Sequence, residues 1–514
     1  MTQGRKGIVY RFYFLILFLL IFCGPRQYSL SQSVQPDSLR SFFAFHFDAD
    51  KISTFTDSDF LLMEESGIRL LYLEGEVSSL AVSRLQNQPF RYFFSPGSSY
   101  LVSTGNRQAD SLYLQNIFDQ YQLITRSLQE KTAGFGIADY PYLKDDDTRR
   151  LMSLFAEELK SPSDNNLPLF FTTGRYDIKP MLPENLNFIH FVTDAGSDLP
   201  VAAGQLYSLS GFDNTHDFYR KLKNLLGKTE GINPVVIVID GEFALEQLSL
   251  SDNLKTTIQN YQQKDAVVVP VPAPQPEGYS LNPPIVILLL ILISYILHYR
   301  YQPRYRHSLG RFFFNHSFFT DDIIENRIQL TTPGFILLIQ HIVMSGLMFY
   351  TVSLALLSNR GLESLFHHFP ALNIFPQSHI SMFFIGVMIS ALSKAVALLW
   401  LHLVNRKLQY FSQVLNLYAW PLQVNLVIVT LGVVALQTGL GENLMIFLFM
   451  IFLFTWYMSF NIAATDSARA LEKNSVLYLA FTVGLNTLFF AAMIMIFFLM
   501  PEFKNPVLFA IWLG

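Results

Sequence analysis

A hydrophobic stretch followed by a basic run divides this sequence into two parts. Residues 281–299 read LNPPIVILLLILISYILHY, and RYQPRYRHSLGR follows at 300–311. About seventeen apolar residues without a charge are long enough to cross a bilayer as one helix. Short strand-like and helix-like segments precede this stretch, whereas long hydrophobic blocks follow it. We therefore predict an extramembrane domain followed by a membrane domain.

The composition agrees with a membrane protein and gives no sign of a nucleic-acid partner. Of the 514 residues, 51% are hydrophobic and 48 are Phe, and the mean hydropathy of +0.30 exceeds that of most soluble proteins. The net charge of −4 leaves no overall basic field to attract nucleic acid. We expect the lipid bilayer to be one partner.

The first residues have the layout of a secretory signal peptide. Three basic residues precede the apolar segment 12–22, and a polar, Ser-rich segment follows it. We predict a signal peptide over residues 1–31, with an uncleaved signal anchor as the alternative. Cys23, the single cysteine, would suit lipid attachment, but Phe22 stands where a small residue is expected before it.

Residues 41–272 alternate β-rich runs with helix-like segments. Eight runs have strand length and Val, Ile, Phe and Tyr cores, and they lie at 42–48, 68–75, 90–95, 134–140, 167–173, 187–194, 234–242 and 265–271. A further short run lies at 204–210. This α/β pattern predicts a (β/α)8 TIM-barrel-like domain, and the alternative is an open doubly wound sheet.

In such a barrel the functional residues lie at the carboxyl ends of the strands. We predict catalytic roles for Asp139 after the fourth strand and for Asp240 or Glu242 after the seventh, because two carboxylates facing each other across the mouth suit an acid and a nucleophile or base. Substrate-binding candidates at the same end are His46, Asp48, Glu74, Tyr140, Arg175 and Asp194.

Four segments together resemble the retaining glycoside-hydrolase barrels. They are FAFHFD, SDFLLMEESGIRLLYLEG, GFGIADYPY and PVVIVIDGEF, in this order. The family's fourth strand ends in Asn-Glu, the Glu being the acid/base, and its seventh ends in the nucleophilic Glu. Here the fourth ends in Ala138-Asp139, and a carboxylate displaced by about an ångström loses on the order of a hundredfold in rate. The resemblance implies a barrel that binds or trims glycans, either as a divergent glycosidase or as an inactive relative.

Other chemistry is not indicated by the sequence. No P-loop, GxGxxG after a strand, HExxH or GxSxG motif occurs. The acidic run at 145–147 precedes a helix-like segment, where carboxylates complement the helix dipole, so it is interpreted as a cap. We therefore expect neither a metal nor a cofactor.

A Pro-rich tether at 273–283 leads to a predicted six-span membrane domain at 284–514. Beyond the first span, hydrophobic segments lie at 334–357, 380–402, 416–437, 443–461 and 476–499, and the basic loops are 300–332, 403–415 and 462–475. The basic loops are expected inside the cell, which places the barrel and the C-terminus outside, at an inner (plasma) membrane. This block resembles an uncharacterised bacterial integral-membrane family that has no assigned activity.

Ionisable and amide residues within the spans are functional candidates. Lys394 is expected either to face the helix bundle or to reach the lipid interface, and His341, Asn425 and Asn486 are its possible polar neighbours. Hydrogen bonding that only holds the helices together is the alternative role. The resemblance of the barrel to glycoside hydrolases implies an envelope or extracellular glycan as ligand. The alternative is a transport or envelope-assembly component with a recognition barrel, acting with a membrane-protein partner or as a homo-oligomer.

Overall fold

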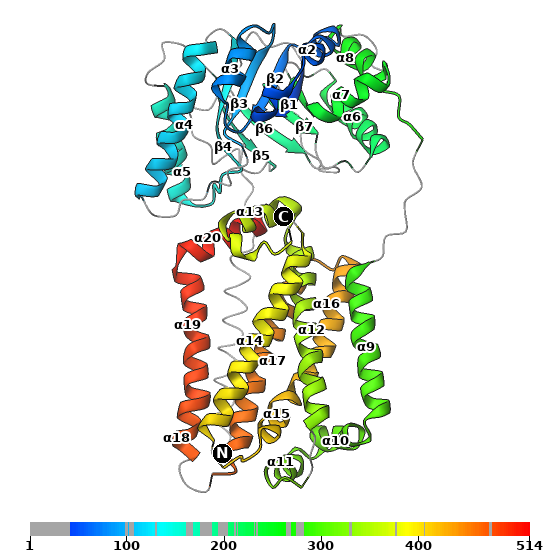
Figure 1. The fold of residues 1–514 in the computed structure, drawn as a ribbon, viewed down its shortest axis with the longest axis vertical. Coiled ribbons are helices and arrows are strands. Elements are labelled where there is room, and N and C mark those ends of the chain that lie inside the picture. Colours follow the sequence, from blue (N-terminus) through cyan, green and yellow to red (C-terminus); the bar gives the residue numbers. More distant parts are fainter. Residues whose placement is uncertain are drawn as a thin grey trace, which may run out of the picture. The chain divides into compact units, whose positions relative to one another are not determined.

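The computed structural model describes most of the chain. The described residues are 42–97, 101, 107–128, 131–160, 168–174, 188–193, 204–209, 212, 214, 215–230, 232, 235–263, 269–273, 282–327, 331–375, 378–405, 407–471 and 475–513. They form two compact units, one built around a β-barrel and one around long apolar helices (Figure 1). The predicted signal peptide and most of the predicted tether lie outside the described residues.

Eight parallel strands close into a barrel in sequence order. They are β1 Phe42–Asp48, β2 Leu70–Glu74, β3 Arg91–Ser95, β4 Thr132–Asp139, β5 Leu169–Thr173, β6 Phe188–Thr193, β7 Gln205–Leu209 and β8 Val235–Asp240. The barrel closes where β1 pairs with β8, and His46 lies beside Asp240 in that register. The fold is therefore the predicted (β/α)8 class and not an open sheet.

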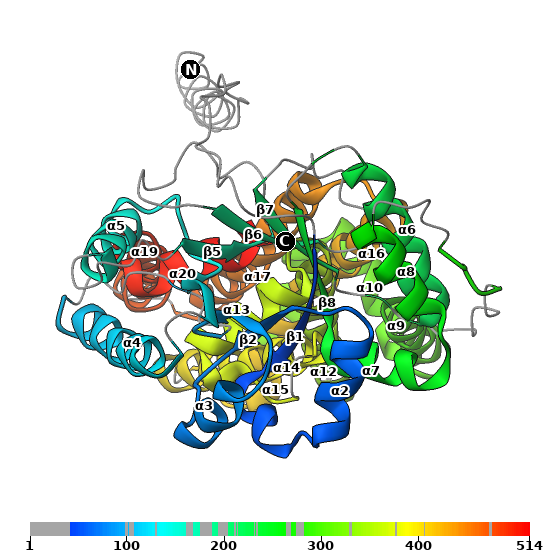
Figure 2. The same cartoon turned by 90° about the horizontal axis from the view of Figure 1, so that it is seen from above.

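Described helices follow β1, β2, β3, β4, β7 and β8 and lie outside the barrel (Figure 2). They are η1 Ala49–Thr54, α2 Asp57–Glu65, α3 Ser79–Gln86, α4 Arg107–Leu128, α5 Asp146–Lys160, α6 Thr215–Thr229, α7 Gly241–Leu250 and α8 Asn253–Gln263. Local sequence sets several of their starts: the side chains of Ser78, Asn214 and Asp240 accept hydrogen bonds from the first turns of α3, α6 and α7.

Two of the predicted strands need correction. The short run at 204–210 contains β7, so the run at 234–242 is the eighth strand and not the seventh. Because β8 closes onto β1, the barrel leaves no edge for another strand, and residues 269–273 form none. The rest of the predicted run at 265–271 lies outside the described residues. Pro270 and Pro272 lack the N–H that pairing with a neighbouring strand requires. The valines of this run are typical of a strand, and the prediction gave them more weight than the prolines.

The barrel interior is filled by apolar side chains. Ala44, Leu70, Tyr72, Phe93, Ala133, Phe170, Leu206, Val236 and Val238 form one buried cluster drawn from seven of the eight strands. Alternate residues of a barrel strand point inward, so these residues form a solid core and leave no pore. Any ligand of the barrel is therefore bound at the ends of the strands and not within them.

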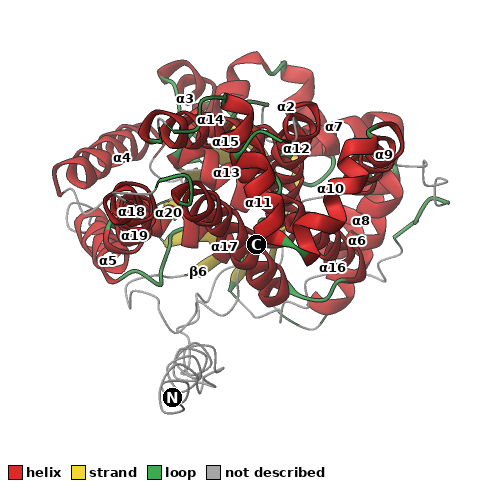
Figure 3. Ribbon diagram, turned by 90° about the horizontal axis from the view of Figure 1, so that it is seen from below, coloured by secondary structure: helices red, strands yellow, loops and turns green. Residues whose placement is uncertain are grey.

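The second unit has six helices that are long and apolar enough to span a membrane, as the sequence predicts. They are α9 Pro283–Tyr301, α12 Thr331–Leu356, α14 Ile380–Val404, the broken span Phe411–Thr438, α17 Glu442–Ala468 and the span Ser475–Leu499. The shorter elements are α10 Pro303–Phe314, α11 His316–Ile324, α13 Asn359–His368, η4 Pro370–Leu372 and α20 Pro501–Trp512. The protein is therefore a multi-pass membrane protein, and Figure 3 shows the helices of this unit in red.

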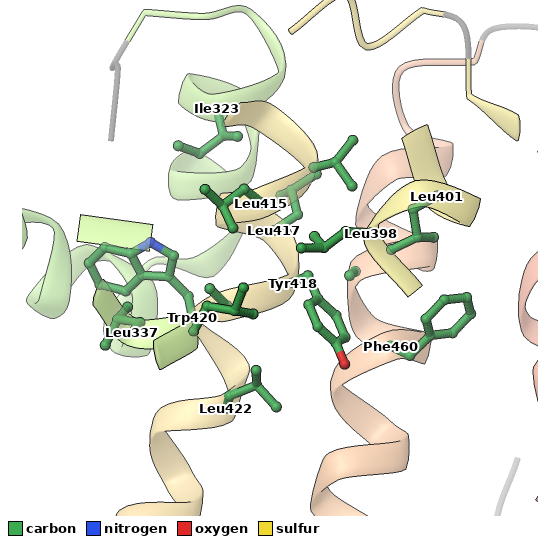
Figure 4. Close-up of a cluster of buried hydrophobic side chains, with 14 of the residues drawn as sticks. Ile323, Leu337, Leu398, Leu401, Leu415, Leu417, Tyr418, Trp420, Leu422 and Phe460 are labelled. Atoms are coloured by element: carbon green, nitrogen blue, oxygen red, sulfur yellow. The ribbon is translucent and has the colours of Figure 1, made fainter. Parts of the chain in front are cut away.

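Two spans are irregular. The fourth consists of α15 Phe411–Ala419, η5 Pro421–Val424 and α16 Asn425–Thr438, and it breaks at Pro421, which has no N–H for an α-helix. The sixth consists of α18 Ser475–Leu479, the π-turn η6 Ala480–Gly484 and α19 Leu485–Leu499. Tyr418 and Trp420 directly precede the break in the fourth span, within a buried apolar cluster that Figure 4 shows.

The helix α12 is the centre of the membrane domain. In α12 and in the broken span 61% of the most apolar window is buried inside the protein, compared with 6% in the last span. Two glycines bring α12 close to α14, because a Cβ at Gly346 would lie 2.6 Å from Val387 Cγ2 and 2.9 Å from the Phe383 carbonyl oxygen. A Cβ at Gly386 would lie 2.9 Å from the Ser345 carbonyl oxygen. Small residues at this crossing therefore allow the two backbones to touch.

A glycine pair tests the packing of the barrel. A Cβ at Gly241 would overlap the ring of Phe47 at the barrel rim, whereas a Cβ at Gly227, on the exposed face of α6, meets nothing within 4 Å. We expect Gly241→Ala to destabilise the barrel by about 1–3 kcal/mol through overpacking. Gly227→Ala should stabilise it by about 0.5–1 kcal/mol through helix propensity. Denaturant unfolding of the full-length protein, followed by near-UV circular dichroism, measures both. Equal stability of the two variants would contradict the packing at Phe47.

Candidate functional site

A ring of polar side chains lies at the carboxyl ends of the strands. In six strands a polar residue follows an apolar core residue by two positions, so both point toward the barrel axis. With Asp139 at the end of β4 and His190 in the middle of β6, the ring contains one residue per strand: His46, Glu74, Ser95, Asp139, Thr172, His190, Ser208 and Asp240. The apolar core below them separates this mouth from the opposite end of the barrel.

His46 and Glu74 form an ion pair on the first two strands. His46 Nε2 lies 2.7 Å from Glu74 Oε2, and each side chain is between a quarter and a third exposed. Burial lowers the pKa of His46, but the hydrogen bond with Glu74 and the charges of Glu74, Asp240 and Asp48 outweigh it, so the pKa is raised above its ordinary value. The pair therefore presents a carboxylate whose orientation is fixed by an imidazole.

Asp139 is a buried acid beside this pair. Only 2% of the residue is exposed, and Ser95, on the strand between those of Glu74 and Asp139, donates a hydrogen bond of 2.6 Å to Asp139 Oδ1. Burial, together with the negative charge of Glu74, raises the pKa of Asp139 to about 8, although nearby hydroxyls and His46 partly oppose this. Asp139 is therefore mainly protonated at neutral pH.

The second oxygen of Asp139 has no partner. Oδ2 is fully buried and makes no hydrogen bond within the described part of the chain. Because Oδ1 accepts from Ser95, the proton of the neutral acid belongs on Oδ2, where it is an unused donor. A buried donor without an acceptor costs about 1–3 kcal/mol, so this atom indicates a place where a ligand oxygen would be bound.

A second hydrogen-bonded group occupies the other side of the ring. His190 Nδ1 lies 3.1 Å from the Tyr72 hydroxyl and 3.3 Å from Thr172 Oγ1, and His190 Nε2 lies 2.7 Å from Ser208 Oγ. Burial raises the pKa of Tyr72 well above its ordinary value, so its hydroxyl stays protonated. The sequence analysis did not identify these residues. One sequence pattern could have identified them: each polar residue stands two positions after an apolar residue of the same predicted strand.

The predicted partners of Asp139 on β8 have other contacts. Asp240 Oδ1 accepts a hydrogen bond of 2.9 Å from the Phe243 N–H and so caps α7. Glu242 is exposed on the first turn of α7 and forms an ion pair with Lys51, whose ammonium also lies 3.3 Å from Asp48. Asp240 thus belongs to the ring, whereas Asp48 and Glu242 form a charged cluster at its rim.

Of the remaining predicted substrate-binding residues, only Tyr140 lies within the described residues. Tyr140 follows Asp139 directly and has a φ of +46°, a backbone conformation that costs a non-glycine residue of order 1–3 kcal/mol. Such strain beside a buried acid is typical of functional sites. Arg175 and Asp194 lie outside the described residues. No group of three His, Cys, Asp or Glu side chains suited to a metal ion occurs in the described part of the chain.

Three of the four predicted polar residues of the membrane domain meet in its interior. Lys394, His341 and Asn425 are all fully buried and belong to one hydrogen-bonded chain. Asn486 is not part of it, because its amide nitrogen donates to Asn461 Oδ1 at 3.1 Å. Lys394 therefore faces the bundle and not the lipid interface.

Comparison with protein families, with curated proteins and with solved structures gives no match to this chain. The function is therefore argued from the geometry of the ring and of the membrane domain.

The raised pKa of Asp139 predicts a pH-dependent stability. The unfolded chain releases this proton near pH 4 and the folded barrel near pH 8, so the folded state holds the extra proton between these values. Stability should be highest at the acid end of this window and fall by up to about 1.4 kcal/mol per pH unit as the pH rises through it. Asp139→Asn should remove most of this slope. Denaturant unfolding of the full-length protein at pH 5, 6, 7 and 8 measures it, and an unchanged slope in the variant would contradict the assignment.

Proposed function

We propose that this protein is a membrane-anchored barrel that binds or trims glycans of the cell envelope at the polar ring. The observation that carries the proposal is the buried Asp139, whose raised pKa keeps it protonated and whose Oδ2 has no partner in the described part of the chain, next to the carboxyl group of Glu74. Two carboxyl groups at one barrel mouth, one of them kept protonated, are the groups that glycoside hydrolysis requires.

The charge of the mouth favours a neutral, hydroxyl-rich ligand. Among the described residues the ring contains carboxyl groups, hydroxyls and imidazoles, and Lys51 at its rim is already paired with Asp48 and Glu242. Acidic groups of this kind repel phosphate and carboxylate ligands but accept hydrogen bonds from sugar hydroxyls. The resemblance of the strand segments to glycoside-hydrolase barrels supports the same class of ligand.

Each group then has a defined role. Asp139 gives its Oδ2 proton to the glycosidic oxygen as the C–O bond breaks, and Glu74 either attacks the anomeric carbon or removes a proton from the attacking water. His46 is a positioning residue that holds Glu74. We prefer Glu74 to Asp240 and Glu242 as the second carboxylate, because its charge is a main cause of the raised pKa of Asp139, whereas Asp240 caps α7 and Glu242 pairs with Lys51.

A second candidate function is a transport or envelope-assembly component whose barrel only recognises its partner. The hydrogen-bonded chain around Lys394 favours it, because an anchor needs no buried amine in its spans. In this case the unused donor of Asp139 binds a ligand oxygen without transferring its proton.

Four variants of the full-length protein in detergent test the barrel site. With aryl glycosides and isolated envelope glycan as substrates, Asp139→Asn and Glu74→Gln should each lower kcat/KM by on the order of 10²–10⁴. Glu242→Gln is the matched control at the rim and should stay within about twofold of the parent. Asp240→Asn tests the alternative partner, and a loss there without one in Glu74→Gln would assign the role to Asp240.

Calorimetric binding separates the two candidate functions. Glycan that binds but is not cleaved, with weaker binding to Asp139→Asn, would identify a recognition barrel. A protein that neither cleaves nor binds any of these glycans would contradict the proposal.

The loop charges give a separate prediction of orientation. The loop that follows α9 is rich in arginine, so we propose that it lies in the cytoplasm and that the barrel and the C-terminus lie outside. A reporter enzyme fused after Asn315 should therefore be active in the cytoplasm, and one fused after Trp512 should be active outside it. A cytoplasmic C-terminal reporter would contradict the orientation.

A further inference from the structure

Lys394 is a fully buried amine in the interior of the membrane domain. Its helix α14 packs against α12 and α15, which carry no carboxylate, and α17 carries Glu442 and Asp466 only near its two ends. A charged side chain at the centre of a membrane helix costs about 2.5–3.5 kcal/mol on insertion scales, and such residues are usually functional. A role as a membrane anchor alone therefore does not explain a lysine at this position.

Hydrogen bonds connect Lys394 to His341 through two serines. Lys394 Nζ donates to Ser390 Oγ, and Ser390 Oγ donates to Ser345 Oγ at 2.9 Å. Ser345 Oγ donates to the His341 carbonyl oxygen of its own helix at 2.8 Å and lies 3.3 Å from His341 Nδ1. On the other side of the imidazole, the Asn425 amide nitrogen donates to His341 Nε2 at 2.6 Å. The hydroxyls of two serines thus lie between the amine and the imidazole.

The chain ends at the broken span. The side-chain oxygen of Asn425, the first residue of α16, accepts a hydrogen bond from Thr455 on α17. Discontinuous helices are where membrane transporters place their ion sites, because the break frees polar groups that must be paired. The break at Pro421 lies four residues before Asn425 and thus brings a polar side chain into the core at the level of His341.

The pattern of donors favours a proton over an anion as the species bound. An anion site needs donors that converge without partners, yet the polar side-chain atoms of Lys394, Ser390, Ser345, His341, Asn425 and Thr455 all have hydrogen-bond partners within the chain. The face of Trp456 covers the amine, with Nζ 4.1 Å from the ring centroid. This position stabilises an ammonium ion without any counter-ion.

We propose that Lys394 and His341 share one exchangeable proton through Ser390 and Ser345, so that the membrane domain contains a proton-binding site and works as a proton-dependent device. The two groups are too close in an apolar interior for both to be charged at little cost. The proposal is independent of any activity of the barrel.

The proton transfer is balanced along the chain. The Ser345 hydroxyl first turns from the His341 carbonyl oxygen to Nδ1. An Nζ–H bond of Lys394 then breaks as its proton passes to Ser390 Oγ, the hydroxyl proton of Ser390 passes to Ser345, and that of Ser345 passes to His341 Nδ1. The positive charge moves from the amine to the imidazole. The transfer requires His341 with its proton on Nε2, which then donates to the amide oxygen of Asn425 after the amide rotates by half a turn.

Few titratable groups face this pair. His341 comes from α12, and Tyr418 on α15 contacts Trp456 of α17. The helix α9 packs against α12 and carries Tyr295 and His298, and His298 contacts Gln340 beside His341. The broken span contributes the amides of Gln423 and Asn425, and η6, which also contacts α14, contributes no acid or base. A pH-dependent signal at Trp456 is therefore expected to report one of these five titratable groups, and loss of the signal in Lys394→Met assigns it to the amine.

Fluorescence of Trp456 tests the proposal in the full-length protein in lipid nanodiscs. The emission of the parent minus that of Trp456→Phe isolates this residue, and protonation of the amine above its ring should change it between pH 5 and 10. Lys394→Met should abolish the transition, and His341→Asn should shift its midpoint by about one pH unit or more, as expected for coupled sites. In Ser390→Ala the additional change His341→Asn should shift the midpoint less than in the parent, because the hydroxyl path is interrupted while the charge repulsion between the two groups remains.

Two variants serve as controls. Thr351→Val removes a buried hydroxyl of α12 that bonds only to its own helix, and Tyr418→Phe removes the other nearby acid, so both should keep the transition. Variants are compared only when their circular dichroism and elution volume equal those of the parent. A flat signal in the parent, a transition that survives in Lys394→Met, or a midpoint that His341→Asn leaves unchanged would overturn the proposal. A response to added phosphate at constant pH, in place of the response to pH, would overturn it in favour of an anion site.

Discussion

Closure of the barrel is the constraint on which the candidate site depends. Pairing of β1 with β8 fixes the position of each strand relative to its neighbours, and this register sets which side chains share one level above the apolar core. Ser95 contacts Asp139, and Glu74 lies near both, because β2, β3 and β4 are neighbours in a closed sheet. The groups that raise the pKa of Asp139 lie close to it, but only the closed barrel brings them there.

The sequence predicted the class of fold because its signals are local. Apolar alternation identifies strands, and the long uncharged helices follow from hydropathy alone, so the barrel class and the six spans agree with the structure. Which of the strand-like runs form the eight strands was harder to predict from the sequence. The runs at 204–210 and 265–271 look equally strand-like, and only closure onto β1 decides that the first contains β7 and that β8 completes the barrel.

The candidate site was only partly predictable for a similar reason. Asp139 and Glu74 end their strands, where the barrel rule places functional groups, so both were identified. His190 lies in the middle of an aromatic run, and its contacts with Tyr72 and Ser208 depend on the stagger between distant strands. The capping role of Asp240 follows from the turn into α7, which no count of carboxylates reveals. The polar chain of the membrane domain likewise required the relative rotation of α12, α14 and α16.

The glycine crossing between α12 and α14 has a mechanical consequence. The backbones touch at Gly346 of α12 and Gly386 of α14. Beside this contact, Ser390 of α14 donates a hydrogen bond to Ser345 of α12. Helices in such contact cannot turn about their own axes independently without a clash or the loss of that hydrogen bond. Any conformational cycle of the membrane domain would therefore carry α12 and α14 as one rigid body. The last span has the lowest buried share of the six, 6% of its apolar window, and is the natural element to move against that body.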